Sequence, residues 1–226
     1  MSEYQIECIS LSKSFKRNNE TVIALEDINL RIKRNSTTLL KGRSGAGKST
    51  LLNLMCGLIK PTQGKVIIND QVISELPDET LSKILLNEFG IIFQNFNLLP
   101  TYTIFENIEV ALIPKKIIQS VTKEQIFSYL KEFNLEDKAY KLPAELSVGQ
   151  QQKVAIIRTL IKQPSVIFAD EPTGSVDDET AAEILSCLNK LKKEQFVTLV
   201  IATHGNIPDG FADEIIQLEN GRIGSR

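Results

Sequence analysis

Short apolar segments alternate with longer amphipathic segments over most of the 226 residues. Four segments near the start have the alternation or the β-branched content expected of strands: 4–11, 28–32, 36–41 and 65–68. Polar residues at 16–20 and at 69–70 mark turns between them. One helix is expected in this region, from Lys48 to about Gly57, because Pro61 follows its end.

From about residue 77 to residue 142 the pattern is mostly helical, with helical apolar spacing at 103–112 and 122–133. After Pro143, helices and short apolar strands alternate. The expected helices begin at about 149 and cover 179–192, and the expected strands are 166–169, 197–202 and 215–218. Such alternation implies a parallel sheet that is covered on both faces. We therefore expect an α/β fold with an antiparallel β region at the front and a helical insertion in the middle.

Composition narrows the class of protein. Hydrophobic residues make up 42% of the chain and charged residues 24%, which suits a globular core. The net charge of -2 and the absence of Trp argue against a nucleic-acid partner. Cys8, Cys56 and Cys187 are too widely spaced for a metal cluster or a disulfide framework, so we expect reduced thiols. We expect no signal peptide, and no apolar run approaches the roughly 20 residues of a membrane-spanning helix.

A glycine-rich loop follows the expected strand at 36–41. Residues 42–49 read GRSGAGKS, which fits the phosphate-binding pattern G-x-x-x-x-G-K-S. Glycines let backbone N–H groups approach phosphate oxygens, and the following helix adds the positive end of its dipole. Lys48 can reach the β- and γ-phosphates, and the Ser49 hydroxyl can ligate Mg²⁺. The expected nucleotide-binding residues here are Gly42, Arg43, Ser44, Gly45, Ala46, Gly47, Lys48, Ser49 and Thr50.

Two carboxylates follow the apolar strand at 166–169. In an open α/β sheet, ligands bind at the carboxyl ends of the strands. We expect Asp170 to hold Mg²⁺, directly or through water, and Glu171 to polarise the attacking water. Alone, such a pair is more often a solvated strand end. Its combination with the phosphate loop indicates ATP hydrolysis.

Residues 146–152 read LSVGQQQ, and there the chain resembles the ABC transporter ATPase family. The family signature is LSGGQ, so Val148 is the one departure. Gln94 is similar to the Q-loop glutamine of that family, Asp177 lies in a match to its D-loop, and His204 matches its switch histidine. The resemblance covers nearly the whole chain. It implies a P-loop NTPase core of ABC type with an antiparallel β subdomain and a helical signature subdomain.

The resemblance also implies a division of the chain and a role for each motif. About 1–92 and 163–226 would form the RecA-like core with the β subdomain, and about 93–162 the helical subdomain. Members form head-to-tail dimers around two ATP molecules, so a homodimer is expected on ATP binding. Gln94 would ligate Mg²⁺, and His204 would bind the γ-phosphate beside the base Glu171. Further nucleotide contacts are implied for Ser147, Gly149, Gln150 and Asp177.

The sequence leaves the roles of three positions open. Phe15 is the best match to the aromatic residue on which the family stacks adenine, and the alternative is a plain core residue. Gly205 stands where the family usually has Asp, which leaves the geometry next to His204 open. Val148 would be strained at positive φ because it is β-branched. Since the catalytic positions are intact, we expect a negative φ there.

A finer resemblance concerns the partner. Residues 93–107 read FQNFNLLPTYTIFEN, similar to the branch that serves lipoprotein release, macrolide export and FtsE-type division control. It implies a separately encoded integral membrane permease and a cytoplasmic, peripheral location at the inner face of the cell membrane. We expect the apolar segment 96–103 to dock that permease. Alternatively, Phe96, Leu98 and Leu99 fill the local core.

Three classes of function contain ATPases with these motifs. An ATPase that drives export, membrane extraction or mechanical coupling through a permease is the main prediction. An ATPase that regulates a cell-wall enzyme through a permease-like partner fits the same residues. A soluble ATPase acting on DNA or the ribosome is disfavoured. Family members that act on DNA carry a long coiled-coil insertion, which this sequence lacks, and members that act on the ribosome carry two ATPase domains, whereas this sequence has one.

Overall fold

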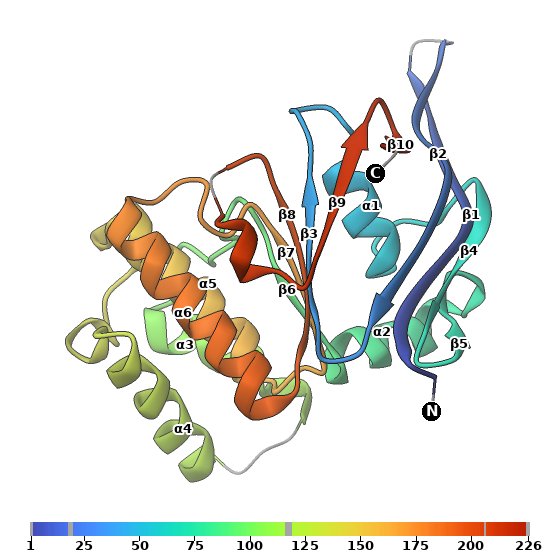
Figure 1. Cartoon of the computed structure of the whole chain (residues 1–226). Helices are drawn as coiled ribbons and strands as arrows, with labels where there is room; N and C mark the ends of the chain where they lie inside the picture. Colours follow the sequence, from blue (N-terminus) through green and yellow to red (C-terminus); the bar gives the residue numbers. More distant parts are fainter. Residues whose placement is uncertain (1, 18–19, 116–118, 206, 225–226) are drawn as a thin grey trace.

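The computed structural model describes residues 2–17, 20–115, 119–205 and 207–224. Its central element is a six-stranded sheet in the order β10-β9-β3-β8-β7-β6 (Figure 1). The strands are β3 (Thr37–Lys41), β6 (Phe89–Ile92), β7 (Val166–Asp170), β8 (Thr198–Thr203), β9 (Glu214–Glu219) and β10 (Arg222–Ile223). All neighbouring pairs are parallel except β10 with β9. The carboxyl ends of β3, β7 and β8 therefore lie together at one end of the sheet.

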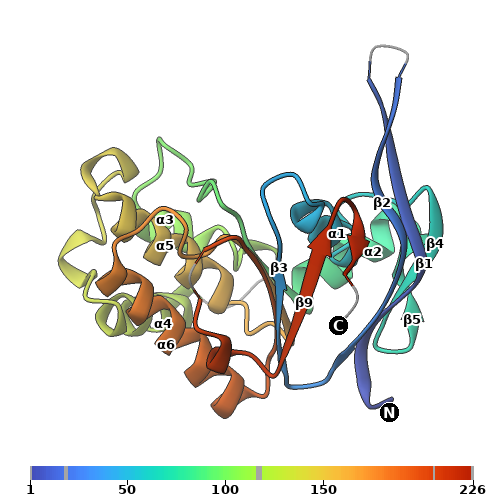
Figure 2. The ribbon, with the colours of Figure 1, turned by 45° about the horizontal axis from the view of Figure 1, so that its top comes forward.

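Both faces of this sheet are covered, as the sequence predicts. Helices pack on one face (Figures 1 and 2): α3 (Ile104–Glu109), α4 (Gln119–Glu132), α5 (Val148–Leu160) and α6 (Asp178–Gln195). The other face meets α1 (Lys48–Met55), with α2 (Asp78–Asn87) beside it, and a second sheet. Consecutive sheet residues join different cores: Leu40 and Phe168 pack toward α1, whereas Leu39 and Ile167 pack toward α5 and α6. Burial on both faces explains why these strands are continuous apolar runs.

The second sheet is antiparallel and has the order β2-β1-β4-β5. Its strands are β1 (Tyr4–Arg17), β2 (Glu20–Lys33), β4 (Gln63–Ile68) and β5 (Gln71–Val72). Along β2 the buried residues alternate with exposed ones at Ile28, Leu30 and Ile32, because only one face of this sheet meets the core. Figure 2 shows that β1 and β2 reach beyond the rest of the molecule.

Most predicted elements are confirmed, and two predictions are wrong in part. The turn expected at 16–20 is shorter, because Lys16 pairs with Thr21 within the sheet, and residues 18–19 lie outside the described part of the chain. Strand β6 lies inside the segment that was expected to be mostly helical. The four residues of β6 include a glycine and are too few to show the alternating pattern of a strand. Gly90 fits there because an added Cβ would lie 2.6 Å from the Thr159 methyl of α5.

None of the helices in the described residues is long and apolar enough to cross a membrane.

Two buried threonines provide a test of this packing. Thr38 in β3 is fully buried, and its hydroxyl has no partner among the described residues. Thr198 in β8 is equally buried, but its hydroxyl accepts a hydrogen bond from the Asn35 backbone N–H at 2.9 Å. Valine has the same shape as threonine and no polar atom. We expect Thr38→Val to raise the free energy of unfolding by about 1 kcal/mol, because an unpaired hydroxyl leaves the core.

Thr198→Val is the matched control and should lower the free energy of unfolding by about 1 kcal/mol, because Asn35 loses its acceptor. Urea denaturation of both variants beside the wild type measures the difference. Equal losses in the two variants would contradict the assignment of Thr38 as an unpaired group.

Candidate active site

The glycine-rich loop connects the end of β3 to the start of α1, as predicted. At two of its positions only glycine fits, one because of the backbone conformation and one because of the lack of space. Gly47 precedes α1 with φ of 100°, where a side chain is strained. A Cβ on Gly42 would lie 2.3 Å from the Leu218 carbonyl oxygen of β9. The loop is therefore packed closely against the sheet.

Lys48, the first residue of α1, directs its ammonium group back onto this loop. Its Nζ donates to the carbonyl oxygens of Gly42 at 2.9 Å and Arg43 at 3.2 Å. The side chain is buried, so these carbonyl oxygens replace the water that would otherwise solvate the ammonium group. A positive charge held inside a glycine loop at a helix N-terminus is suited to bind phosphate oxygens.

Ser49 and Asp170 form the part of the site that is suited to a hard cation. The Ser49 hydroxyl donates to Asp170 Oδ1 at 3.0 Å, which links the start of α1 to the end of β7. Burial raises the pKa of the Asp170 carboxyl, so its charged form lacks full solvation and would be stabilised by a cation. Mg²⁺ binds to one or two carboxylates together with phosphate oxygens. The oxygen donors here fit Mg²⁺ on that basis, with Gln94 lining the same cleft.

Glu171 follows directly and is held by the end of β8. Its backbone has φ of 49°, an uncommon value for a residue with a side chain. The carboxylate is buried; Oε1 accepts from the His204 backbone N–H at 2.8 Å and contacts the His204 ring Nδ1. Oε2 accepts from the Thr203 hydroxyl at 3.1 Å. Sequence reasoning found Glu171 and His204 but missed Thr203, since no motif marks a buried hydroxyl.

These groups open into one cleft of about 520 Å³, a size suited to a small ligand. Its lining includes Lys48, Ser49, Gln94, Glu171 and His204, together with Val22, Ile23 and the neighbouring loop residues. The structure thus brings residues of the phosphate loop, Glu171 and the predicted switch histidine into one cleft, and Asp170 adjoins it through its hydrogen bond from Ser49. Gly205 adjoins it, and its N–H donates to the Thr203 hydroxyl at 2.9 Å.

Phe15 lies on β1 directly opposite Val22 of β2, so the two side chains share one face of the sheet. Val22 lines the cleft, and Phe15 is 42% exposed. The alternative that Phe15 fills the core is therefore wrong. The Lys13 ammonium lies 5.0 Å from the Phe15 ring centroid.

The signature residues lie at the start of α5, outside the lining of this cleft. Ser147 caps the helix: its Oγ accepts from the Gln150 N–H at 3.3 Å, and its N–H donates to Gln150 Oε1 at 3.0 Å. Val148 is the first helical residue, is absent from the described residues with positive φ, and is 49% exposed. The expected negative φ at Val148 is confirmed.

Asp177 lies beside the signature. It caps α6 by accepting from the Thr180 N–H at 2.8 Å. Gly149 of α5 packs on the same threonine, since an added Cβ would lie 3.1 Å from its methyl group. The signature and the D-loop match thus meet at Thr180 within the chain.

The apolar segment after Gln94 is held from inside the protein. The Asn107 side chain is fully buried, donates to the carbonyl oxygens of Leu99, Tyr102 and Thr103, and accepts from the Leu99 N–H. Arg158 of α5 donates to the carbonyl oxygens of Phe96 and Asn97, both at 2.7 Å. Leu98 packs against the core, whereas Leu99 and Tyr102 are 37% and 44% exposed. The core alternative is therefore right for Leu98 and wrong for Leu99, and Phe96 is half-buried.

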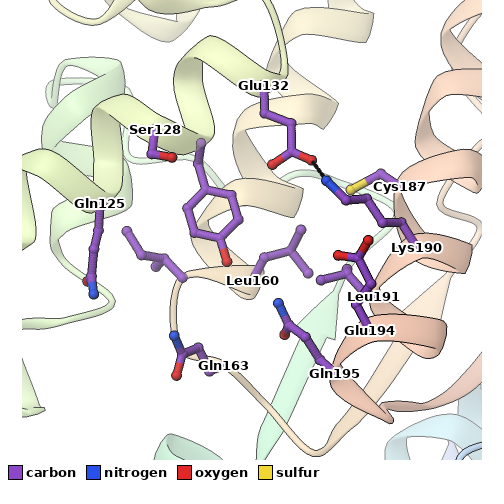
Figure 3. Close-up of a pocket in the computed structure, with 12 residues that line it drawn as sticks. Gln125, Ser128, Glu132, Leu160, Gln163, Cys187, Lys190, Leu191, Glu194 and Gln195 are labelled. Atoms are coloured by element: carbon purple, nitrogen blue, oxygen red, sulfur yellow. Dashed lines mark hydrogen bonds and ion pairs between the residues drawn. The ribbon is translucent and has the colours of Figure 1, made fainter.

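A separate cleft lies between α4 and α6 (Figure 3). Glu132 and Lys190 form an ion pair at 2.8 Å that joins these helices. Tyr129 is half-buried there, and burial raises the pKa of its hydroxyl. None of the residues expected to bind nucleotide lines this cleft.

Comparison with known proteins identifies the family. Residues 25–174 match the family model described as ABC transporter. The ABC transporter ATP-binding protein YtrE of Bacillus subtilis is 42% identical over 91% of this chain and 88% of its own length. The lipoprotein-releasing system ATP-binding protein LolD of Buchnera aphidicola is 34% identical over 99% of this chain and 98% of its own length.

A solved structure of the ATP-binding cassette MJ0796 of Methanocaldococcus jannaschii is similar throughout. It shows a dimer in a post-hydrolysis state bound to ADP and Pi, with a TM-score of 0.92, 37% identity and 97% of each chain covered. The chain therefore belongs to the ABC transporter family, and it is an ATP-binding, ATP-hydrolysing subunit of that family.

Proposed function

We propose that two copies of this chain close around two ATP molecules and that hydrolysis drives a separately encoded membrane permease. The observation that carries this proposal is the division of the site. The cleft holds the phosphate loop and Glu171, but Ser147 and Gly149 do not line it. A second copy would supply those residues, and the related cassette from Methanocaldococcus jannaschii is a dimer. The exposed capped start of α5 then meets the γ-phosphate with its N–H groups and positive dipole end.

Each residue of the cleft has a role in this proposal. Lys48 exchanges its bonds to the loop carbonyls for bonds to the β- and γ-phosphates. Ser49, Gln94 and Asp170 hold Mg²⁺, whose charge would neutralise the phosphate oxygens. Phe15 stacks on adenine; its exposure and its position opposite Val22 support this. The remaining phosphate-loop residues, with Gln150 and Asp177 of the second copy, complete the nucleotide contacts.

Glu171 acts as the base in this proposal, and His204 controls access to it. In the structure His204 contacts Glu171 Oε1 through both its N–H and its ring. When ATP is bound, the ring turns to the γ-phosphate. Oε1 then keeps the hydrogen bond from the His204 backbone N–H but loses the ring contact, so it can accept a proton from the attacking water. The contact of the His204 ring with Oε1 is the observation that supports this role.

The partner and the location follow from the same reasoning. The relatives include a component of a lipoprotein-releasing system. We propose that residues 93–162 form the helical subdomain, which contacts the permease, and that 1–92 and 163–226 form the core. The chain would then lie on the cytoplasmic face of the membrane through its permease. Identifying the integral protein that co-purifies from solubilised membranes tests this and separates transport from cell-wall signalling.

Glu171→Gln tests the catalytic assignment. We expect ATP turnover to fall by about 100-fold or more, because general base catalysis contributes about that much. ATP binding should persist, so gel filtration with ATP and Mg²⁺ should show a stable dimer. Lys48→Ala is the complementary variant and should weaken nucleotide binding itself. A Glu171→Gln protein that stays monomeric and turns over ATP at the wild-type rate would refute the assignment.

Leu99→Asp tests the docking segment. Leu99 is exposed on a segment that Asn107 and Arg158 hold in place, so a charge there should disrupt permease binding and leave the fold intact. We expect co-purification of the permease to fall about tenfold or more, with the ATPase activity of the isolated chain unchanged. Leu58→Asp, at a leucine that is 43% exposed elsewhere, is the control. If Leu99→Asp unfolds the isolated chain, the segment is part of the core instead.

Val148→Gly tests the departure in the signature. Valine at ordinary helical φ carries no backbone strain, so its only cost is the bulk of an exposed isopropyl group. We expect ATPase activity to rise by less than about tenfold, or ~1.4 kcal/mol in barrier. Gly149→Ala is the contrasting variant and should reduce activity, because its Cβ would press on Thr180. A large loss of activity in Val148→Gly would show that valine is required there.

A further inference from the structure

Thr203, the last residue of β8, links the proposed base to the loop that carries the switch histidine. Its side chain is 1% exposed. The hydroxyl donates to Glu171 Oε2 at 3.1 Å and accepts from the Gly205 N–H at 2.9 Å. The hydroxyl therefore both donates and accepts a hydrogen bond within the site, and neither bond pairs strands of the sheet.

The two oxygens of the Glu171 carboxylate have different partners. Among the described residues, the partner of Oε1 is His204, through its backbone N–H and its ring. Oε2 is bound by Thr203. If His204 turns to a phosphate, the ring contact is lost, and the backbone N–H of His204 stays on Oε1. Thr203 is then the side-chain donor that still holds the carboxylate among the described residues. With Oε2 fixed in this way, the remaining lone pair of Oε1 points in a defined direction.

The backbone of Glu171 makes this support necessary. Its φ of 49° is strained for a residue with a side chain, and its N–H donates to the Ala202 carbonyl oxygen at 2.9 Å. Both the main chain and the carboxylate of Glu171 are thus attached to consecutive residues at the end of β8. Strained conformations persist only where the surroundings hold them.

We propose that Thr203 is a positioning residue for hydrolysis: it fixes Oε2 of Glu171 so that Oε1 is directed at the attacking water. The inference rests on the role proposed above for Glu171. It assigns no contact between Thr203 and the nucleotide. Loss of the hydroxyl should therefore reduce turnover and leave ATP affinity intact.

Thr203→Val is the test, because valine keeps the shape and fits a strand end. We expect kcat to fall about tenfold or more, as for loss of a hydrogen bond to a charged group, with KM for ATP within about twofold. Thr203→Ser keeps the hydroxyl and should recover kcat to within about threefold of wild type. Thr198→Val, at the other end of β8, should leave kcat within about twofold. If Thr203→Val does not fold, Thr203→Ala replaces it.

A double-mutant cycle separates positioning from a structural role. In single-turnover hydrolysis, adding Thr203→Val to Glu171→Gln should cause no further loss, because the base is already absent. A full additional loss in that background, or a wild-type kcat for Thr203→Val, overturns the proposal for Thr203. A wild-type rate for Glu171→Gln alone overturns the role of Glu171 instead. The two failures are therefore distinguishable.

Discussion

The register of β8 between β3 and β7 determines where the groups of the site lie. Lys41 at the end of β3 pairs with Thr203, and Asp170 at the end of β7 pairs with Ala202. A strand buried on both faces resists slipping by one residue, because every side chain would change faces. Parallel pairing thus places the start of the phosphate loop, the two carboxylates and the histidine loop beside one another. The site is a consequence of how the apolar core packs.

Local strain occurs where this regular pairing ends. Glu171 leaves β7 with positive φ, and its N–H still bonds to β8 at Ala202. The turn directs its carboxylate toward Thr203 and His204 instead of along the strand. Burying a carboxylate is unfavourable unless hydrogen bonds compensate, and these donors supply them. The same bonds that stabilise the buried carboxylate therefore also occupy both of its oxygens, so the role proposed for Glu171 as a base requires the contact with the His204 ring to change.

Sequence patterns predicted the fold class and the residues that meet in the cleft, because those depend on local signals. The glycine loop needs positive φ and close approach, and apolar runs ending in Asp170-Glu171 or His204 mark strand ends. What could not be predicted depends on distant contacts. Strand β6 is a strand because Phe89 pairs with Val166 of β7. The role of the Thr203 hydroxyl depends on its hydrogen bonds to Glu171 and Gly205, which are distant in sequence or lie in a loop. The exposure of Phe15 depends on its place in the antiparallel sheet, opposite Val22.

The same sheet also connects the cleft to the surface proposed for the permease. Ile92 at the end of β6 pairs with Ala169, which directly precedes Asp170. Gln94 follows β6, lines the cleft, and leads into the segment that Arg158 and Asn107 hold by its carbonyl oxygens. A shift of Gln94 toward or away from a bound nucleotide would thus act on a segment whose carbonyl oxygens at Phe96, Asn97 and Leu99 accept hydrogen bonds from side chains. Because side chains of α3 and α5 hold the segment, we expect it to move together with these helices. A small change at the phosphates would then displace the surface proposed for the permease.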